Sequence, residues 1–448
     1  MVALAAASLS LWLAEGLARA QVQVPYNANR YHSLVAYNAK TEIPVGTVIT
    51  EQNWKQYQNF LPIGLQELYA GTFGWKAGTT ADTTITVGPY HEYRWFKRWN
   101  EDTEKYSQQV KLVKLPSGGI SISGYYAGTP FPEINPNDPD AGGKAYLNAW
   151  FGYRPWASDW LSPGFKIDSH GSVSYSLSET QTYHLDHLSD SDARTKPGGK
   201  GVNVVLRTMV LKPEQSKYTT SLQIWTFDPG VPQETYSFLP SSRRPLRLSA
   251  AQRCAPVAGS DNVVDDGFSG IGLQPTQFIF NYLGRHKVLL KAHVDAANGE
   301  LPLDTVYTKE GALPAWPKPV LGPWEVRTVD VVDATPVAGN EGYCYSHRVV
   351  YFDTQMRGNL WIDIYDADGN LWKEFELYPV FRPLTSAYVE PGATFFQQAQ
   401  GYSVTRDFQN KHASAGAAYH FTMDDNVPAP WNNTKVYSGP AGLQEIMR

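Results

Sequence analysis

The chain has 448 residues and a net charge of −5, and 13% of its residues are aromatic whereas 18% are charged. A chain of this length can form one to three domains, and its slightly acidic charge excludes the basic field that nucleic-acid binding requires. The many aromatic and few charged residues favour a β-rich protein exported from the cytoplasm, with wide apolar or carbohydrate-like surfaces.

The first twenty residues, MVALAAASLSLWLAEGLARA, have the features of a secretory signal peptide. Their apolar stretch is too short to span a bilayer, and the A-x-A sequence from Ala18 to Ala20 is typical of a cleavage site. The alternative is an apolar N-terminal helix. We therefore expect residues 1–20 to be removed on export and residues 21–448 to form the mature protein.

Helix signals are sparse and concentrate near the start of the mature part. In residues 50–71, Thr50 is suited to cap a helix, apolar residues recur at helical spacing, and Gly71 can end it. Pro62 should divide this segment into two pieces and open the second. Another short helix is expected over residues 141–153.

Strand signals dominate the rest of the chain. In residues 172–185, serines alternate with Val173, Tyr175 and Leu177, as in an antiparallel strand with one polar and one apolar face. Further strands are expected at residues 202–211, 218–227, 324–334 and 343–353. The pattern predicts a long antiparallel meander that can curl into an open or partial barrel.

The sequence HLDHLSDSD is the nearest approach to a metal-binding pattern. Two histidines three positions apart share one face of a helix, but here they follow a strand pattern and should point to opposite faces. We interpret this segment as a solvated loop and assign no metal ligands. Its candidate ligand residues are His184, His187, Asp190 and Asp192.

An arginine-rich segment follows the central strands. Its cluster of four consists of Arg243, Arg244, Arg247 and Arg253. Such a cluster can bind anionic head groups or the acidic surface of a partner. The alternative is a set of ion pairs with the acidic residues just downstream, Asp261, Asp265 and Asp266.

The chain contains two cysteines, Cys254 and Cys344. In an exported protein an even number of cysteines suggests a disulfide, and one between these positions would close a long loop and stabilise the fold by about 4 kcal/mol. The alternative, two free buried thiols, is left open.

Residues 363–374, DIYDADGNLWKE, resemble a calcium-binding loop in length and in their acidic residues. The loop of an EF-hand needs oxygen ligands at positions 1, 3, 5 and 12 and a glycine at position 6, and neither register places both the ligands and Gly369 correctly. The flanking residues alternate as in strands, and DADGN contains residues that tolerate positive φ. We therefore predict a β-hairpin turn.

No motif indicates catalysis. The sequence lacks the G-x-S-x-G, H-E-x-x-H, phosphate-loop and G-x-G-x-x-G patterns. Acidic residues are plentiful, but the sequence alone cannot place two of them across a cleft, as a glycosidase would require. We therefore predict no catalytic residues and no cofactor.

Several segments together resemble one family. They include GTVITEQNWKQYQNFLP, RRPLRLSAAQR, WEVRTVDVVDA and RVVYFDTQMRGNLWIDIYDADGNLWK. These segments resemble an exported Gram-negative family of unknown function that is often labelled outer-membrane lipoprotein-sorting protein and is similar to LolA/LolB-type carriers. The segment RHKVLLK, residues 285–291, departs from the aromatic-rich sequence expected there.

The resemblance implies a mainly β fold, with a large curved antiparallel sheet forming an open half-barrel and a few covering helices. It implies that residues 21–448 form a single LolA-like β domain with an N-terminal helical segment and a hydrophobic cavity. It also implies a periplasmic location, with an inner-membrane transporter of the resistance-nodulation-division type and an outer-membrane protein as partners.

We therefore predict a non-enzymatic periplasmic carrier or chaperone for a lipid, a lipidated chain or an apolar nutrient. Burial of an acyl chain on the sheet would stabilise it by about 0.8 kcal/mol per methylene. The candidate binding residues are Arg243, Arg244 and Arg247, together with the aromatic residues Trp225, Tyr351, Trp361, Tyr365 and Trp372, for which core packing is the alternative. The rival functions are a polysaccharide hydrolase with paired carboxylates and a non-catalytic envelope scaffold.

Overall fold

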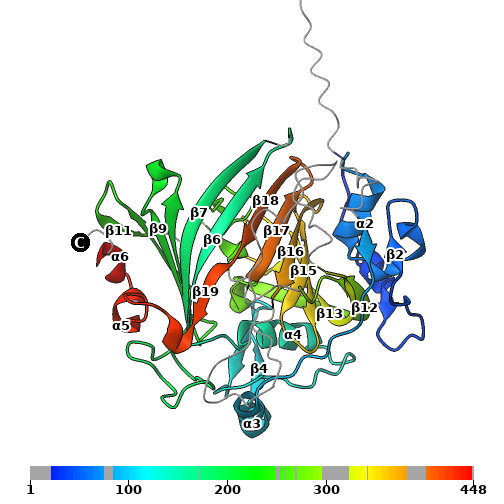
Figure 1. The fold of residues 1–448 in the computed structure, drawn as a ribbon. Coiled ribbons are helices and arrows are strands. Elements are labelled where there is room, and N and C mark those ends of the chain that lie inside the picture. Colours follow the sequence, from blue (N-terminus) through cyan, green and yellow to red (C-terminus); the bar gives the residue numbers. More distant parts are fainter. Residues whose placement is uncertain are drawn as a thin grey trace, which may run out of the picture.

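The computed structural model describes most of residues 22–445, as a large sheet with helices packed against it (Figure 1). The predicted signal peptide lies outside the described residues. The described ranges are 22–74, 84–170, 172–248, 253–257, 259–267, 270–294, 322–340, 342–380 and 400–445.

One antiparallel sheet of 15 strands dominates the structure. The strands follow the order β1-β12-β13-β14-β15-β16-β17-β18-β6-β7-β8-β9-β10-β11, and β19 also pairs with β6. Their bounds are β1 Val35–Ala36, β6 Ala157–Ile167, β7 Val173–Tyr183, β8 Val202–Lys212, β9 Thr220–Thr226, β10 Glu234–Leu239, β11 Arg244–Arg247, β12 Phe278–Leu290, β13 Glu325–Pro336, β14 His347–Asp353, β15 Asn359–Tyr365, β16 Leu371–Pro379, β17 Gln400–Asp407, β18 His412–Ala417 and β19 Tyr419–Met423. Because β1 and β11 end this order without pairing with each other, the sheet is open, and the predicted mainly β half-barrel is confirmed.

Two small strand pairs and a few short helices complete the described structure. The pairs are β2 Val48–Ile49 with β3 Ile85–Thr86, and β4 Lys111–Lys114 with β5 Ile120–Ser123. The α-helices are α1 Ala28–His32, α2 Ile63–Ala70, α3 Lys97–Tyr106, α4 Ala141–Trp150, α5 Thr434–Tyr437 and α6 Gly442–Glu445. The 3-10 helices are η1 Trp54–Gln56, η2 Gln58–Phe60, η4 Ser107–Gln109, η5 Glu214–Ser216, η7 Val264–Asp266, η8 Pro275–Gln277 and η12 Asp424–Asn426. Within the described ranges, no helix has the length and apolar character needed to cross a membrane.

The predicted helical segment at residues 50–71 is divided at Pro62, as expected. Helix α2 begins directly after Pro62 and ends at Gly71, whose φ of 66° lies in the left-handed region that glycine tolerates. The piece before Pro62 differs from the prediction, because it forms the 3-10 helices η1 and η2 rather than one α-helix. An α-helix there would have to stop within two turns, since proline disfavours the α conformation in the residue that precedes it.

The predicted strands and the predicted turn are present. Strands β7, β8, β9 and β13 lie within the expected ranges or differ from them by two residues or fewer. Strand β14 begins at His347, later than predicted, and Cys344 forms a disulfide just before it. In the hairpin between β15 and β16, the Gly369 N–H donates to the Asp366 carbonyl at 3.0 Å, and the φ of Gly369 is 82°.

The sheet curves around α4. One apolar cluster joins residues of α4 to Val204 of β8 and Trp225 of β9, and also to Phe280 of β12 and Val332 of β13. Since β8 and β9 lie far from β12 and β13 in the strand order, one cluster can include both only if the sheet bends toward them. The face that carries α4 is therefore the concave face.

The other face of the sheet carries two separate covers. The N-terminal residues, including Tyr31 and Leu65, pack with Trp361 and Val404 over the middle of the strand order. The C-terminal helices pack at the far end, where Leu443 of α6 joins Tyr183 of β7 and Leu222 of β9. Figure 1 shows these covers on opposite sides of β6 and β18.

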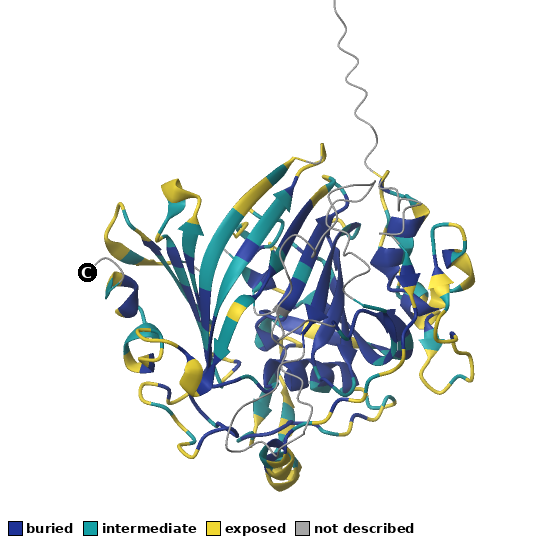
Figure 2. Ribbon diagram, in the orientation of Figure 1, coloured by how far each residue is buried: buried dark blue, intermediate teal, exposed yellow. Residues whose placement is uncertain are grey.

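The two parts of the sheet differ in burial. Every residue of β15 is buried, because helices or loops cover both faces of this strand. Strands β6 and β7 instead contain many residues of intermediate exposure. Figure 2 shows this contrast as dark blue strands around β15 and β16 and lighter strands at β6 and β7.

Candidate functional site

Strands β6 and β7 carry a row of apolar side chains on one face. The register pairs Pro163 with Leu177 and Phe165 with Tyr175, and the two aromatic rings lie 5.5 Å apart. Residues directly paired in an antiparallel sheet, and residues two apart along a strand, share a face. We call the row formed by Leu161, Pro163, Phe165, Tyr175 and Leu177 the apolar band, which ends where Leu161 pairs with Glu179.

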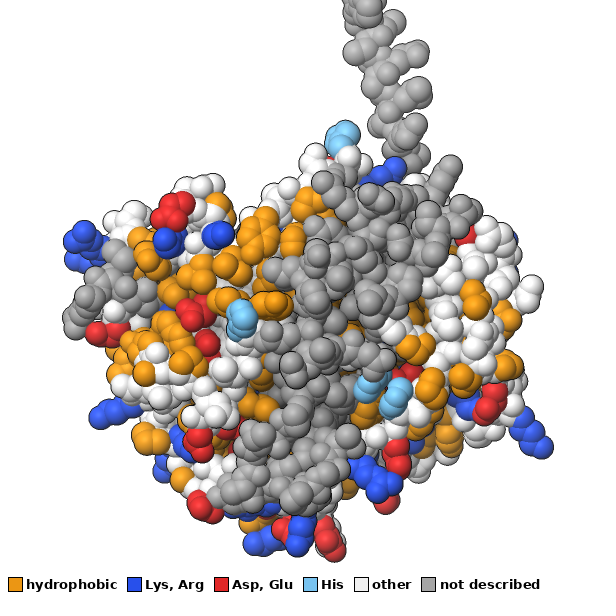
Figure 3. All heavy atoms as spheres, in the orientation of Figure 1, with side chains coloured by type: hydrophobic (Ala, Val, Ile, Leu, Met, Phe, Trp, Pro, Cys, Tyr) orange, Lys and Arg blue, Asp and Glu red, His pale blue; other side chains and the backbone are white. Residues whose placement is uncertain are grey.

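The apolar band is incompletely buried. Tyr175 is 41% exposed, and Leu161, Phe165 and Leu177 are of intermediate exposure. Phe165 packs at the border of the cluster that contains the N-terminal residues, whereas Tyr183, at the other end of β7, belongs to the cluster under the C-terminal helices. The band therefore lies between the two covers, and Figure 3 shows hydrophobic side chains gathered on this part of the surface.

The opposite face of the same two strands is lined by hydroxyl groups. The Ser162 Oγ lies 3.1 Å from the Thr180 Oγ1, which in turn donates to the Thr208 Oγ1 of β8 at 3.5 Å. Ser176 and Ser178 point to this face as well, because they alternate with Tyr175 and Leu177. The alternation predicted from the sequence therefore separates a hydroxyl-lined face from an apolar one.

The aromatic residues predicted on the sheet have core positions. Trp225 is 3% exposed in the concave cluster, and Tyr351, Trp361 and Tyr365 are at most 1% exposed beneath the N-terminal cover. Trp372 is partly buried, and its indole N–H donates to the Asp407 Oδ2 at 2.8 Å. These five aromatic residues therefore belong to the core, as the alternative of core packing states. The apolar band was not identified as a binding site from the sequence.

Part of the arginine segment forms an internal ion pair, and part of it lies on the surface. Arg253 forms an ion pair with the buried Asp265 at 2.5 Å, as the alternative of internal ion pairs expects. Arg243, Arg244 and Arg247 are exposed on or beside the edge strand β11, where Arg247 pairs with Glu234 of β10 at 2.9 Å. These three arginines are therefore on the surface and accessible to a partner.

Cys254 and Cys344 form a disulfide, with 5.8 Å between their Cα atoms. Cys254 lies in the segment before η7, and Cys344 lies just before β14, so the bond connects a loop of the concave side to the sheet. Both residues pack against the concave apolar cluster.

Most of the segment HLDHLSDSD is buried, although Asp192 is exposed, so its interpretation as a solvated loop is wrong. His184 is 7% exposed, Asp186 is 6% exposed and Asp190 is 5% exposed. The Asp186 carboxylate accepts from the backbone N–H of Gly201 at 2.7 Å, and Asp190 accepts from the Tyr153 hydroxyl at 2.8 Å. Backbone and side-chain donors inside the fold form hydrogen bonds with these carboxylates. In a solvated loop, water molecules would form these hydrogen bonds instead.

Two close carboxylates lie on the sheet in the interior. Glu374 and Glu376 of β16 both contact the Arg406 guanidinium of β17, and all three side chains are at most 2% exposed. Burial lowers the pKa of Arg406 to about 9 and raises the pKa of Glu376. A polysaccharide could not reach this pair, so it gives no support to the alternative of a hydrolase.

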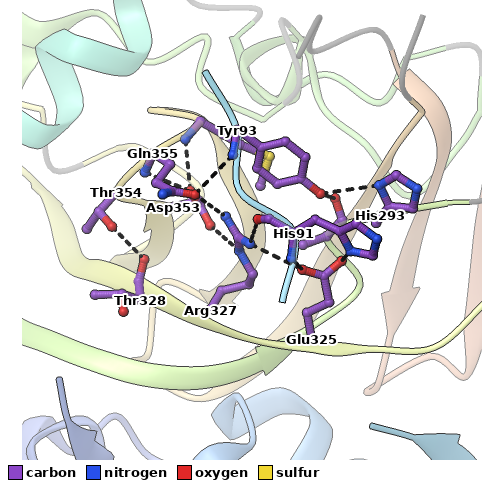
Figure 4. Close-up of polar contacts among 11 residues, drawn as sticks. His91, Tyr93, His293, Glu325, Arg327, Thr328, Asp353, Thr354 and Gln355 are labelled. Carbon is purple, nitrogen blue, oxygen red and sulfur yellow. Dashed lines mark hydrogen bonds and ion pairs between the residues drawn. The ribbon is translucent and has the colours of Figure 1, made fainter. Parts of the chain in front are cut away.

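A cluster missed by the sequence analysis lies beside the start of β13 (Figure 4). It consists of His91, His293 and Glu325, whose nearest nitrogen and oxygen atoms all lie within 4.8 Å of one another. The two imidazole rings stack at 4.1 Å with an interplanar angle of 9°. These residues are more than 30 positions apart along the chain, so no local spacing could have indicated them.

A second layer of polar residues holds this cluster. Glu325 accepts from the backbone N–H of His91 at 3.0 Å and from the Arg327 guanidinium at 3.2 Å. Arg327 in turn donates to Asp353 at 2.7 Å and to Gln355 at 3.2 Å. Figure 4 shows Arg327 between the histidine end of this network and the end formed by Asp353 and Gln355.

The comparisons identify relatives in sequence and in fold. A family model described as protein of unknown function (DUF1329) matches residues 48–431, which confirms the resemblance to a family of unknown function. No curated protein matches the chain.

Three solved structures resemble the fold at low sequence identity. An outer membrane lipoprotein-sorting protein domain from Vibrio parahaemolyticus is 14% identical, with a TM-score of 0.43, covering 67% of this chain and 100% of that one. A DUF1329 family protein from Desulfovibrio piger is 12% identical, with a TM-score of 0.43, covering 66% and 98%. A LolA superfamily protein from Nitrosomonas europaea is 10% identical, with a TM-score of 0.35, covering 64% and 94%.

Proposed function

This chain belongs to the DUF1329 family, and we propose that it is a non-enzymatic periplasmic carrier that binds a molecule with a long apolar chain, such as a lipid, on the apolar band of β6 and β7. The single observation that carries the proposal is the incomplete burial of this band within a sheet whose central strand β15 is buried along its whole length.

The band has the chemistry that an acyl chain needs. Aliphatic and aromatic side chains follow one another along two paired strands, so a linear apolar chain can contact several of them at once. Each methylene removed from water contributes about 0.8 kcal/mol. Since Phe165 of the band packs against the apolar cluster of the N-terminal residues, a bound chain would extend the core rather than create an isolated contact.

The disulfide supports an oxidising compartment. Disulfides persist in the periplasm and are rare in the cytosol, and the Cys254–Cys344 bond is built into the concave side of the fold. A periplasmic location also fits the predicted signal peptide at residues 1–20.

The exposed edge of β11 supports a protein partner. Arg243, Arg244 and Arg247 gather there, and clustered arginines favour association with acidic surfaces. We propose that this edge docks the chain to an envelope transporter of the resistance-nodulation-division type or to an outer-membrane protein, which would deliver or receive the apolar ligand.

The proposal can be tested with a fluorescent fatty acid as the probe. The double substitution Tyr175→Ser and Leu177→Ser should weaken binding by about 10-fold or more, because each buried apolar side chain contributes about 1.5–3 kcal/mol and 1.4 kcal/mol corresponds to a factor of ten. The matched control is Ser176→Ala with Ser178→Ala, which changes the opposite face of the same strand.

Unchanged binding by the folded band variant would contradict the proposal, as would an equal loss in the control. Native mass spectrometry of the protein isolated from the periplasm gives an independent measurement, since a carrier should retain part of its natural ligand.

A further inference from the structure

We propose that His91, His293 and Glu325 form a binding site for a divalent transition-metal ion such as Zn²⁺. The site lies on the side of the sheet at β13, outside the apolar band, and its existence does not depend on the proposed carrier function.

The donor atoms suit such an ion. Two imidazole nitrogens and one carboxylate oxygen are a ligand set found in zinc sites with three protein ligands. The atoms lie within 4.8 Å of one another, and two donors bound to one tetrahedral Zn²⁺ are about 3.4 Å apart. Movement of each side chain by about 1 Å would therefore bring all three onto one ion.

The carboxylate is held in place before any ion binds. Glu325 is fully buried at the start of β13. The His91 backbone N–H and the Arg327 guanidinium both donate to its Oε2, at 3.0 and 3.2 Å, whereas its Oε1 faces the His91 ring at 2.7 Å. One oxygen is thus fixed by donors from the second layer, and the other is directed toward the histidines.

The backbone segments that carry the ligands are connected to one another. Val87 forms a parallel bridge with Trp324, and the Gly88 N–H donates to the Trp324 carbonyl at 2.7 Å, which fixes the segment of His91 beside that of Glu325. On the other side, the Tyr93 hydroxyl donates to the Ala292 carbonyl at 3.1 Å and lies 3.4 Å from the His293 Nδ1. Such contacts orient metal-binding histidines through the ring nitrogen that does not bind the ion.

The cluster places two imidazoles beside one carboxylate. The His293 ring lies parallel to the His91 ring, with 4.1 Å between their centroids. Two protonated rings at this distance would repel each other. Two neutral rings and one carboxylate would instead coordinate a cation together.

The surrounding charge also favours a divalent cation. Glu325 and Asp353 each carry a negative charge, and Arg327 between them carries one positive charge, so the network has a net negative charge when both histidines are neutral. Arg327 is directed to both carboxylates and to the His91 backbone carbonyl, at 2.6 Å, and it lies over the Tyr93 ring at 4.8 Å (Figure 4).

The site is accessible from solvent. The His91 side chain is 39% exposed, whereas the Glu325 side chain is 1% exposed. An ion can therefore enter past the histidine and reach the buried carboxylate. With three protein ligands, a tetrahedral ion would keep one position for water or for another small ligand.

The test is titration of the mature chain, purified without a histidine tag, with Zn²⁺ followed by calorimetry and with Co²⁺ followed by its visible absorption. We expect one ion per chain and the absorption of a four-coordinate Co²⁺ site. His91→Asn and His293→Asn should each weaken Zn²⁺ binding by more than the roughly 10–100-fold that loss of a second-layer partner costs. Tyr93→Phe should have a smaller effect.

The matched control is His412→Asn, because His412 is also a half-exposed histidine near a carboxylate, 3.7 Å from Asp261. This variant should bind Zn²⁺ like the unchanged chain. Glu325→Gln should also abolish tight Zn²⁺ binding. If this buried substitution prevents folding, the variants His91→Asn and His293→Asn test the site instead. Stoichiometric Zn²⁺ binding by a folded His91→Asn/His293→Asn variant would overturn the proposal, as would the absence of binding by the unchanged chain.

Discussion

Asp190 and Asp424 are two buried carboxyl groups close to one another beneath the C-terminal part of the chain. The Tyr153 hydroxyl donates to Asp190 at 2.8 Å, and the Trp156 backbone N–H donates to Asp424 at 3.1 Å. Burial raises the pKa of both carboxyl groups, and the charge of Asp190 raises that of Asp424 further. The hydrogen bonds lower these pKa values but do not cancel the effect of burial.

This pair predicts that stability falls as the pH rises above about 4. A carboxyl group whose pKa is raised on folding contributes stability that is complete below its unfolded pKa of about 3.9 and is lost as the pH rises through the folded pKa. Asp424→Asn should therefore flatten the loss of unfolding free energy between about pH 4 and pH 8. Asparagine also tolerates the positive φ of 53° at this position.

Urea unfolding at a series of pH values measures this effect. The other charged groups that act on the pair are Lys196, near Asp190, and Asp425, next to Asp424. Both are present in the variant, so the difference between the two pH profiles comes from residue 424 and from its effect on Asp190. Parallel profiles would show that Asp424 does not titrate in the folded protein over this range.

Asp363 shows what the local sequence could not reveal. It lies in the predicted hairpin, but its carboxylate is fully buried and accepts hydrogen bonds from the Gly64 backbone, the Trp361 indole and the hydroxyls of Tyr351 and Tyr31. The Gly64 backbone approaches so closely that a Cβ there would lie 2.7 Å from the Asp363 Oδ1. Two of these donors come from residues about 300 positions away.

Replacement of Asp363 by alanine should reduce the free energy of unfolding by at least about 3 kcal/mol. Each buried donor left without a partner costs about 1–3 kcal/mol, and the substitution affects four of them. Denaturant unfolding measures the change, with Asp368→Ala in the exposed part of the same hairpin as the control. A loss no larger than that of the control would mean that water satisfies these donors.

At the scale of elements, alternation along the chain predicted the strands better than the helices. Strand β7 matches the alternating serine and apolar residues, because one of its faces remains partly exposed. The segment before Pro62 carries apolar residues at helical spacing, yet it forms two 3-10 helices. Short strands such as β1 and β19 had no recognisable pattern, since their pairing depends on distant strands.

Strand β11 presents the arginine segment at one edge of the sheet. Replacing Arg243, Arg244 and Arg247 together by glutamate should change the melting temperature little, because exposed charges contribute under about 1 kcal/mol each. If this edge binds a partner, the same triple variant should lose function in cells, measured by a transport or growth assay. A large fall in melting temperature would mean that these residues support the fold instead.

Arg253→Glu is the matched comparison within the same segment. Its guanidinium contacts Asp265, whose side chain is fully buried, so charge reversal would place two negative charges together in the interior. Breaking a buried ion pair in this way costs about 3–5 kcal/mol. The melting curves of the two variants should therefore differ, although all four arginines lie within eleven residues of one another.

At the scale of the whole molecule, the resemblance and the strand pattern predicted the open antiparallel sheet. They could not predict which part of the sheet is buried, because the segments that pack on its outer face come from both ends of the chain. Trp361 and Tyr365 are buried by N-terminal residues such as Tyr31, whereas Tyr175 lies between the two covers and is 41% exposed. The half-exposed band and the histidine cluster both depend on such long-range placement.

This uneven cover predicts a gradient of amide hydrogen exchange across the sheet. Strand β15, buried on both faces, should exchange most slowly, and β6 and β7 should open more readily because fewer apolar contacts hold them. If the apolar band holds the ligand, adding a fatty acid should slow exchange in residues 157–183 and leave β10 and β11 unchanged, since the band lies on β6 and β7 alone. Exchange measured by mass spectrometry with and without the fatty acid decides between a local ligand site and general stabilisation, which would slow all strands alike and contradict the proposed position of the ligand.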